Sequence, residues 1–541
     1  MVFRHFMKII LLLALGLCIF GREKTTAQSS GVIPQPADFE AKEGYFTFAT
    51  PLIGHSGPLL AEAQYLQKAL QNYYQKDYTL TTTKRSGTGI TLLIEPELPH
   101  EGYVLEIGKT YIHITGGSKT GVFYGIQTLL QYCTNKEQIR CCNIKDTPRF
   151  AWRGLMLDES RHFFGKEKVK QLLEQMAFFK LNKFHWHLTD EPGWRIEIKK
   201  HPELTTVGGQ GNWSNPDGKE SQYYTQEEIR EIITYAASLH IEVIPEIDMP
   251  GHATAANKAY PHLSGGGTAE HPDFTFNVGK EETYRFLTEV LREVASLFPA
   301  PYLHIGGDEV AFGIKAWETN PDIQTLMQRE GMTKVREAEQ YFIRRMSDSV
   351  HHLGKTVLGW DELLDSHLPT ENTVIMWWRH DRINQLKKSL SEGYATILCP
   401  RRPLYFDFIQ HQSHKWGRTW NGFCPSEDVY AFPDSGLDRW DIPEQQLNLI
   451  RGIQANVWTE RIQNTHRLDF MIFPRICALA EAAWTPDHKK NYADFRNRLE
   501  KMYPLWDQKE IYYFDTRETE RHPEPTGPQQ QKRNLPMDFR D

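Results

Sequence analysis

Two adjacent carboxylates behind a pair of glycines are the residues best suited to chemistry in this sequence. Residues 306–309 read GGDE and close a short β-prone run that begins at residue 302. Neighbouring carboxylates repel each other, so one of them tends to keep its proton near neutral pH, as a general acid must. Glycines allow a ligand to approach the backbone closely. A salt-bridged strand end would show the same residues, so this motif alone leaves both interpretations open.

Other polar and aromatic residues follow further short β-prone runs. From residue 153 onward such runs alternate with helical stretches, which is typical of a parallel α/β fold. We count eight runs: 153–160, 183–190, 242–248, 302–309, 356–362, 373–378, 394–400 and 452–460. Besides the carboxylate pair, the residues at their ends include Asp190, Asp248, Trp360, Trp378, and Trp458 with Glu460. A purely structural barrel would need no such polar groups there.

The stretches between these runs carry apolar residues at helical spacing. Thr225 and Glu228 form a predicted capping box before one of these helices. The clearest apolar stripes are Val169, Leu172, Leu173, Met176 and Phe179 after the first run, and Leu468, Ile472, Ile476 and Leu479 in a last helix. Eight strand–helix units predict an α/β fold, an eight-stranded β/α (TIM) barrel. Because active sites of such barrels lie at the C-terminal ends of the strands, we expect the residues named above to converge there.

The rest of the chain divides around this barrel. Residues 1–27 resemble a secretory signal peptide: Arg4 and Lys8 precede an apolar run, and small residues close the segment. Residues 28–147 predict a small α+β domain with β-prone runs at 90–96 and 107–117 and a helix at 120–133. Residues 148–506 form the predicted barrel domain, and the Pro-rich residues 507–541 predict a flexible tail.

Composition narrows the partners and the compartment. The chain has 541 residues and a formal net charge of −7 without long charge runs, so it carries no electrostatic footprint for nucleic acid or an anionic membrane. No apolar run is long enough to span a membrane. The signal-like residues 1–27 predict export to the periplasm or the outside; a lipid anchor on Cys18 is the less favoured alternative. Six cysteines would follow signal cleavage, none in metal-binding spacing, and we expect most to be unpaired core thiols.

The adjacency of Asp308 and Glu309 limits the reactions the pair can support. A conventional retaining glycosidase holds two carboxyls on opposite sides of the scissile bond, about 5 Å apart. Neighbouring side chains on a strand diverge, which suits that arrangement poorly. In substrate-assisted hydrolysis the sugar's own 2-acetamido oxygen attacks the anomeric carbon instead. The protein then needs one acid, which we assign to Glu309, and one carboxylate that holds the acetamide N–H, which we assign to Asp308.

Seven segments resemble glycoside hydrolase family 20, the β-N-acetylhexosaminidases, and follow that family's order across the whole barrel. They are RGLMLDESRHFF (153–164), HWHLTDEPGWRIEI (185–198), PEIDMPGHA (245–253), HIGGDE (304–309), GWDE (359–362), YFD (405–407) and VWTE (457–460). Residues 121–131 (GVFYGIQTLLQ) resemble the end of that family's accessory domain. The resemblance implies a retaining, exo-acting enzyme that removes terminal N-acetylhexosamine (GlcNAc or GalNAc) from glycans through an oxazolinium-type intermediate. It implies no cofactor and no metal.

The resemblance also implies a role for each site residue. Tyr405 would donate its hydroxyl to the acetamide oxygen, and Arg153, Asp407 and Glu460 would bind the sugar hydroxyls. Asp190 and His252 would tune the acid pair, with Asp248 behind His252. The walls of the acetamide pocket would be Trp360, Trp378 and Trp458; Trp378 is chosen over its neighbour Trp377 because it directly precedes Arg379.

The sequence departs from the family pattern at two places. Glu191-Pro192 stands where the family usually has Asp-Gln, and proline removes a backbone donor, so the loop after the second strand is expected to differ. Gln454 stands where glutamate is often found.

Three rival functions remain at this point. His185 and His187 form an HxH on one strand face, as in metal-dependent amidohydrolases, although no matching set of later ligands follows. A conventional glycosidase could pair Asp248 with Glu309. A catalytically inactive sugar-binding protein is the third, and the intact carboxylate pair with Tyr405 argues against it.

Overall fold

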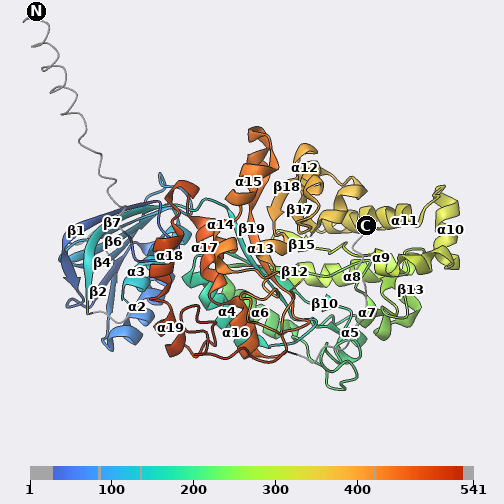
Figure 1. The fold of residues 1–541 in the computed structure, drawn as a ribbon, viewed down its shortest axis with the longest axis horizontal. Coiled ribbons are helices and arrows are strands. Elements are labelled where there is room, and N and C mark those ends of the chain that lie inside the picture. Colours follow the sequence, from blue (N-terminus) through green and yellow to red (C-terminus); the bar gives the residue numbers. More distant parts are fainter. Residues whose placement is uncertain (1–28, 83–86, 134–136, 420–421, 528–541) are drawn as a thin grey trace, which may run out of the picture.

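The computed structural model describes residues 29–82, 87–133, 137–419 and 422–527. The predicted signal peptide and the last part of the predicted tail, residues 528–541, lie outside these ranges. Figure 1 shows a sheet domain formed by the first part of the described chain beside a larger α/β domain.

The N-terminal domain is a seven-stranded mixed sheet with the order β1-β7-β5-β6-β4-β2-β3. Its strands are β1 (Asp38–Thr47), β2 (Leu52–His55), β3 (Thr79–Thr82), β4 (Gly89–Ile94), β5 (Tyr103–Ile107), β6 (Tyr111–Gly116) and β7 (Gln138–Asp146). Helices α2 (Leu60–Tyr74) and α3 (Lys119–Cys133) pack together and against the sheet. The predicted strand at 107–117 is β6 alone, because a turn closed by Gly108 N–H and the Tyr111 carbonyl, 2.9 Å apart, separates it from β5.

The second domain is a closed barrel of eight parallel strands, as predicted, in the order β12-β15-β16-β17-β18-β19-β8-β9. Each strand falls within or next to one of the eight β-prone runs. The strands are β8 (Trp152–Asp158), β9 (Lys183–His187), β12 (Glu242–Glu246), β15 (Tyr302–His304), β16 (Thr356–Trp360), β17 (Thr373–Trp377), β18 (Ala395–Leu398) and β19 (Ile450–Val457).

Helices cover the outside of the barrel between successive strands. They are α4 (Lys166–Phe178), α6 (Gln226–Ser238), α8 (Glu281–Leu297), α11 (Val335–His352), α12 (Ile383–Ser391), α14 (Ser426–Ala431), α15 (Asp434–Trp440), α16 (Thr465–Ile472) and α17 (Arg475–Trp484). The predicted capping box of Thr225 and Glu228 opens α6. Further short helices lie in the connections or after the barrel: α5 (Glu203–Thr206), α7 (Thr254–Ala259), α9 (Ala311–Ile314), α10 (Pro321–Glu330), α13 (Arg401–Leu404), α18 (Tyr492–Leu499) and α19 (Tyr503–Gln508).

Two connections differ from the predicted strand–helix repeat. Between β16 and β17 the chain forms only two 3₁₀ segments, Asp361–Ser366 and Thr370–Asn372, because twelve residues leave no room for a full crossover helix. The single last helix predicted from Leu468 to Leu479 is two helices, α16 and α17. Pro474 separates them, since proline cannot continue a helix from the preceding turn.

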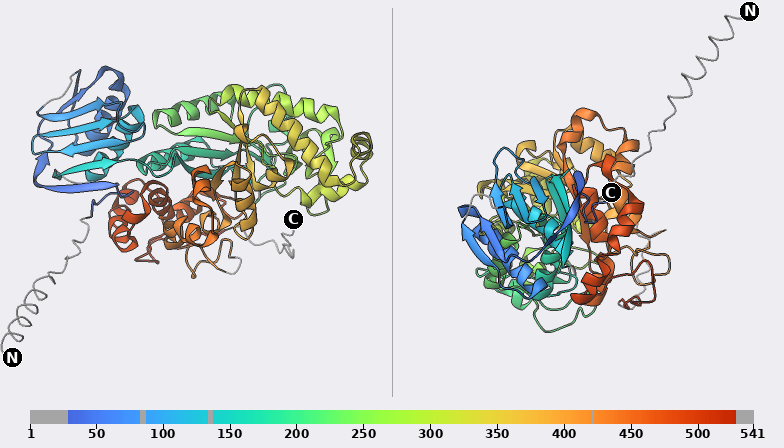
Figure 2. Two further views of the ribbon diagram at one scale, coloured as in Figure 1. Left: turned by 90° about the horizontal axis from the view of Figure 1, so that it is seen from above. Right: turned by 90° about the vertical axis from the view of Figure 1, so that its left-hand side faces the viewer.

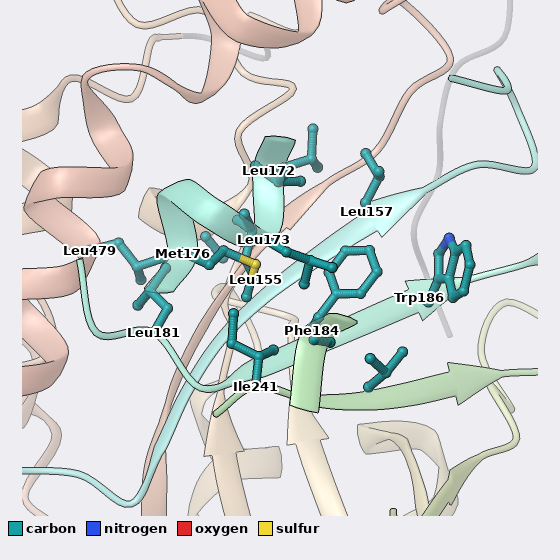
Figure 3. Close-up of a cluster of buried hydrophobic side chains, with 14 of the residues drawn as sticks. Leu155, Leu157, Leu172, Leu173, Met176, Leu181, Phe184, Trp186, Ile241 and Leu479 are labelled. Carbon is teal, nitrogen blue, oxygen red and sulfur yellow. The ribbon is translucent and has the colours of Figure 1, made fainter. Parts of the chain in front are cut away.

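The apolar stripe of α4 packs on the outward side chains of the first two barrel strands. Figure 3 shows Leu172, Leu173 and Met176 from the helix meeting Leu155 and Phe184 from β8 and β9. All five are buried. Burying a leucine or phenylalanine side chain stabilises the fold by roughly 1.5–3 kcal/mol each, so this contact alone fixes the helix against the sheet.

A buried carboxylate ties the two domains together at the end of β7. Asp146 accepts hydrogen bonds from the Tyr103 hydroxyl at 2.7 Å and from the Trp484 indole N–H at 3.0 Å, and Lys180 lies 3.4 Å away. Tyr103 belongs to the sheet, Lys180 to the turn before β9 and Trp484 to α17. Figure 2 shows the sheet at one end of the molecule, next to the barrel. The sheet domain therefore contacts the barrel where strands begin, away from their C-terminal ends.

The predicted flexible tail is wrong for residues 507–527. Tyr513 and Phe514 are buried, and Glu524 accepts the backbone N–H groups of Lys415 and Trp416 at 2.7 and 2.9 Å. Arg467 also donates to the Pro525 carbonyl at 2.7 Å. Burial of Tyr513 and Phe514 and the hydrogen bonds of Glu524 and Pro525 hold this segment on the barrel.

Two expectations about the whole chain can be compared with its described part. There, none of the six cysteines forms a disulfide and all are buried, in agreement with the expected core thiols. No helix within the described ranges is long and apolar enough to cross a membrane.

Candidate active site

The polar and aromatic residues predicted from the strand ends gather at one end of the barrel. Trp360 ends β16, Trp378 follows β17 directly, and the others lie in the loops that follow β9, β12, β15, β18 and β19. This arrangement follows from parallel strands, whose C-terminal ends all meet at one rim.

The Asp308–Glu309 pair turns both of its carboxylates toward one histidine. The Nε2 atom of His252 lies 3.7 Å from Asp308 Oδ2 and 3.6 Å from Glu309 Oε2. Strand β15 has already ended, and Glu309 has a left-handed backbone with φ of 53°. This turn cancels the divergence expected for neighbours on a strand. Strained backbone of this kind persists where the surrounding structure enforces it, commonly at functional sites.

The two glycines before the pair make that turn possible. Gly306 and Gly307 have φ of 66° and 91°. A Cβ atom on Gly306 would lie 1.8 Å from Asp248 Oδ1, and one on Gly307 would lie 2.1 Å from a Leu363 methyl. Only glycine fits either position.

The close carboxyls of Asp308, Glu309 and Asp248 cannot all ionise together, so this group retains protons that its members share. Burial raises the pKa of Asp308 well above its ordinary value, and the nearby charge of Asp248 adds to this effect. Burial also raises the pKa of Glu309, against the opposing charges of His252, Arg418 and Arg161. The Glu309 side chain is 22% exposed and that of Asp308 10%, so Glu309 is the more accessible to a leaving-group oxygen.

Asp190 stands directly behind His252. Its Oδ1 lies 3.0 Å from His252 Nδ1, while its Oδ2 contacts Arg161 at 2.7 Å and His187 Nε2 at 2.8 Å. Burial opposes ionisation, but Arg161 and His252 hold the pKa of Asp190 far below its ordinary value. Burial likewise lowers the pKa of His252, yet the charges of Asp190 and Asp308 prevail and raise it to about 10. A cationic imidazole therefore faces the acid pair.

Asp248 lies close to His252, with a carboxylate oxygen and a ring nitrogen within 4.8 Å, although Asp190 makes the shorter contact at 3.0 Å. Asp248 also accepts the backbone N–H of Gly307 at 3.3 Å and supports the glycine turn. Burial, together with the charges of Glu246 and Asp190, raises its pKa well above the ordinary range. Because the Asp248 carboxylate is engaged with the Gly307 N–H at the glycine turn, the rival that pairs Asp248 with Glu309 across a sugar loses support.

Four buried aromatic side chains cluster beside the pair, and we call this cluster the aromatic slot. Trp378 and Tyr405 lie nearly parallel with ring centroids 6.4 Å apart, and Trp458 lies 6.0 Å from Tyr405 and 5.9 Å from Trp360. Trp377 points elsewhere and packs on Trp440 at 5.3 Å, so Trp378 is the member of the pair that faces the slot.

Fixed hydrogen bonds hold the slot in shape. The Trp360 indole donates to Glu246 and the Trp378 indole to Glu362, at 2.9 and 3.0 Å. Burial raises the pKa of the Tyr405 hydroxyl well above its ordinary value, and the charge of Asp308 adds to this, so the hydroxyl remains a donor.

The opposite end of the site is built from ion pairs. Arg418 pairs with Asp407 and with Glu460, the latter at 2.5 Å. The guanidinium of Arg161 lies 5.0 Å from the centre of the Trp458 ring and also pairs with Asp190. These groups offer charged donors and acceptors next to the aromatic slot, as recognition of several hydroxyls requires.

The expected sugar-binding role of Arg153 is contradicted by its position. Arg153 is the second residue of β8, so it lies at the opposite end of the strand from the site. All five of its N–H donors are engaged: with Glu101 through two bonds, with the Tyr124 hydroxyl, and with the carbonyls of Phe150 and Lys180. Arg153 therefore joins the barrel to the N-terminal domain.

Arg161 is the arginine that the sequence analysis missed. It follows the C-terminal end of β8, whereas Arg153 is the second residue of the same strand. The rule that sites lie at C-terminal strand ends would have selected Arg161 from the same segment. Arg418 gave no such signal, because it lies in a long loop after β18.

Both departures from the family pattern have a structural partner. The carboxylate of Glu191 lies 2.9 Å from His271 Nδ1, in the connection after β12. Pro192 lies in the turn of a small hairpin formed by β10 (Thr189–Asp190) and β11 (Gly193–Trp194). The Gln454 side chain accepts from the Trp152 indole at 3.2 Å and donates toward His185 at 3.0 Å.

Four histidine–carboxylate groups within the described chain are close enough to hold a cation. They are His185-Glu246-His304, His187-Asp190-Asp248, Asp190-Glu191-His252 and Asp248-His252-Asp308. In the first, Glu246 contacts both histidines within 3.1 Å. Such mutual pairing gives these side chains partners without an ion. The absence of a metal stays a prediction.

Comparison with known families agrees with this architecture. The description "Glycosyl hydrolase family 20, catalytic domain" matches residues 150–487, and "Glycosyl hydrolase family 20, domain 2" matches residues 29–147. A β-hexosaminidase of Porphyromonas gingivalis is 37% identical over 79% of this chain, although the match spans only 56% of that relative's length. A β-hexosaminidase of Vibrio furnissii is 35% identical over 84% of this chain and 77% of its own.

Solved structures give the same result. The exo-β-N-acetylglucosaminidase of Vibrio harveyi, solved with N-acetylglucosamine, superposes with a TM-score of 0.82. The two sequences are 34% identical, and the superposed region covers 90% of this chain and 79% of the Vibrio harveyi chain. The β-N-acetylhexosaminidase of Streptomyces coelicolor superposes with a TM-score of 0.76 at 31% identity, over 90% of this chain and 97% of its own.

Proposed function

Because this chain belongs to glycosyl hydrolase family 20, we propose that it is an exo-acting, retaining β-N-acetylhexosaminidase that hydrolyses terminal N-acetylhexosamine from glycans. The similar proteins from Vibrio harveyi and Streptomyces coelicolor carry matching names, and the former was solved with N-acetylglucosamine. Those names support the substrate class. The arrangement of the site supports the mechanism.

In the first step the acetamido oxygen of the bound sugar attacks the anomeric carbon. Glu309 gives its proton to the departing glycosidic oxygen, and the bond to the aglycone breaks. The product is an oxazolinium ion, whose positive charge the Asp308 carboxylate stabilises by holding the acetamide N–H. Asp308 Oδ1 is buried and has no hydrogen-bond partner among the described residues, as a group reserved for a ligand would be.

In the second step Glu309, now ionised, takes a proton from a water molecule. The water oxygen attacks the anomeric carbon from the side the aglycone left. The bond between the anomeric carbon and the acetamide oxygen breaks, which restores the acetamido group. Two displacements at one carbon retain its configuration. The positive charge of His252 stabilises the ionised form of Asp308 and, in the second step, of Glu309.

One observation carries the proposal: both carboxylates face the same histidine beside the aromatic slot. Carboxyls that share one side cannot flank the sugar, so the nucleophile must come from elsewhere. The slot of Trp360, Trp378 and Trp458 excludes water that would compete with the acetamide oxygen. Tyr405 would donate its hydroxyl to that oxygen and fix its direction of attack.

The ion-paired end of the site would bind the hydroxyls of the terminal sugar. We assign Arg161, Asp407 and Glu460 to this task. The loop at residues 213–214 contacts this end of the site: the Trp213 N–H donates to the Arg161 carbonyl at 2.8 Å, and the Ser214 hydroxyl donates to Gln463 at 3.4 Å. Release of single terminal residues is supported by the similar Vibrio harveyi protein, which is called an exo-β-N-acetylglucosaminidase. We also propose export of the enzyme through its N-terminal segment.

Aryl glycosides that differ only at C2 test the proposal. The protein should hydrolyse the 2-acetamido glycosides and leave the matched 2-hydroxy glycosides intact, because only the former bring a nucleophile. A thiazoline analogue of the intermediate should inhibit competitively. Equal rates on both glycosides would favour the conventional two-carboxylate mechanism and overturn the proposal. Binding of the sugar without turnover would favour the inactive sugar-binding protein.

A further inference from the structure

Glu246 is a buried carboxylate inside the barrel, below the acid pair, that the proposed mechanism leaves unused. It ends β12 and has no exposed surface. Four ring nitrogens from three other strands surround it: His185 and His187 from β9, His304 from β15 and Trp360 from β16.

The two oxygens of Glu246 serve different neighbours. Oε1 accepts the Trp360 indole N–H at 2.9 Å and lies 2.9 Å from His304 Nδ1. Oε2 lies 2.5 Å from His187 Nδ1 and 3.1 Å from His185 Nε2. One carboxylate thus holds a wall of the aromatic slot with one oxygen and a barrel histidine with the other.

His187 continues this chain of contacts to the acid pair. Its Nε2 lies 2.8 Å from Asp190 Oδ2, and Asp190 Oδ1 lies 3.0 Å from His252 Nδ1. His252 faces Asp308 and Glu309 at 3.7 and 3.6 Å. Burial disfavours the charged form of His187, yet Glu246 and Asp190 raise its pKa well above the ordinary value. A cation between two anions fixes the orientation of both carboxylates.

From these contacts we propose that Glu246 is a positioning residue that aligns the two halves of the site together. Through Trp360 it sets the wall of the acetamide slot, and through His187 and Asp190 it sets the histidine that faces the acid. This inference rests on the proposed function. Glu246 would thus position both the aromatic slot that holds the acetamido group and the histidine beside the proton donor.

The chemistry of glutamate explains why this position needs a carboxylate. Both oxygens accept hydrogen bonds, so the side chain can serve Trp360 and His187 at once. A glutamine has one accepting oxygen and one donating amide, so one of the two neighbours must lose its acceptor. Burial alone would raise the pKa of Glu246. The nearby His187, His304 and His185 outweigh burial and hold this pKa well below its ordinary value.

Two ratios measured on Glu246→Gln test the proposal. The first is the rate loss on going from a dinitrophenyl to a phenyl leaving group, which reports how well the acid donates its proton. The second is the preference for N-acetyl over N-propionyl glycosides, which reports how tightly the slot is formed. We expect kcat to fall about 10²-fold, as for a misplacement of about 1 Å. We expect the rate on the phenyl glycoside to fall about tenfold more than the rate on the dinitrophenyl glycoside. We also expect the ratio of N-acetyl to N-propionyl hydrolysis to decrease about tenfold.

Three further variants separate the two arms. His187→Gln should increase leaving-group sensitivity and keep the acyl preference. Trp360→Phe removes the five-membered ring that carries the indole N–H. This variant should reduce the preference for N-acetyl over N-propionyl glycosides and leave the dependence of the rate on the leaving group unchanged. His185→Gln is the matched control. His185 contacts Glu246 from the same strand as His187, and its ring packs 6.0 Å from that of Trp360, but it is not a link between Glu246 and either the Trp360 indole N–H or Asp190. Both ratios should stay at wild-type values.

Two results would overturn the inference: wild-type ratios in folded Glu246→Gln, or equal changes in His185→Gln. If Glu246→Gln does not fold, the other variants decide, and an unchanged ratio in His187→Gln or in Trp360→Phe refutes that arm of the inference. Wild-type protein that fails on N-acetyl aryl glycosides would instead refute the proposed function, before any variant is compared.

Discussion

Replacing Arg161 and Arg153 in parallel separates sugar recognition from domain attachment. Arg161→Met keeps an apolar stem of similar length against Trp458 and removes the guanidinium that pairs with Asp190 at 2.7 Å. Arg153→Met removes five hydrogen-bond donors at the domain junction. The two substitutions change the same atoms at opposite ends of one strand, so each is the control for the other.

The structure gives a magnitude for each effect. A hydrogen bond to a charged group contributes about 1.5–3 kcal/mol, so Arg161→Met should lower kcat/KM by about 10- to 150-fold for each sugar hydroxyl it contacts. Removing one partner of a buried ion pair costs about 3–5 kcal/mol. The Glu101 side chain remains 21% exposed and can rehydrate, so we expect Arg153→Met to lose about 3 kcal/mol of unfolding free energy.

Steady-state kinetics on an aryl N-acetylglucosaminide and urea unfolding of both variants provide the assay. Both variants should unfold more readily than the wild type, because Arg161→Met also breaks a buried ion pair, with Asp190. The variants differ in activity: folded Arg161→Met should lose kcat/KM, whereas folded Arg153→Met should keep the wild-type value. The reverse pattern, with a catalytic defect in folded Arg153→Met and none in Arg161→Met, would refute the placement of the two arginines.

The remaining predictions concern the acid, the acetamide donor, pH and metal. Glu309→Gln should reduce turnover of poor leaving groups by about 10²–10⁴-fold and that of dinitrophenyl glycosides far less, measured on matched aryl glycosides; uniform loss would count against general acid catalysis. Tyr405→Phe should lower kcat by about 10²–10³-fold, and an unchanged kcat would remove Tyr405 from the acetamide site. The raised pKa of His252, about 10, stabilises the folded state fully below the unfolded value near 6.5, and that stability is lost as pH rises through 10. Unfolding free energy should therefore fall across this window, and His252→Gln should flatten the decline; parallel curves would contradict the assigned charge. Dialysis against a chelator should leave activity intact, whereas loss restored by added metal would revive the metal-dependent rival.

The sequence determined the architecture because the periodicities that define strands and helices are local. Alternation and helical stripes predicted the eight barrel strands in order, and the C-terminal-end rule placed Asp190, Asp308 and Trp458 at a common rim. Residue type and adjacency also determined the chemistry expected of the Asp308–Glu309 pair. The predicted boundaries differ from the structure where a proline or a short connection interrupts the helical pattern, as at Pro474.

Only the tertiary structure decided which charged groups face one another. Two arginines eight positions apart in one segment have different roles because a strand carries its ends to opposite faces of the barrel, and family resemblance alone chose the wrong one. Asp190, from the loop after β9, makes the short contact with His252 in the loop after β12, and a left-handed turn at Glu309 brings neighbouring carboxylates to one side. Such contacts join residues distant in sequence, and their geometry is set by packing of the whole barrel rather than by any local pattern.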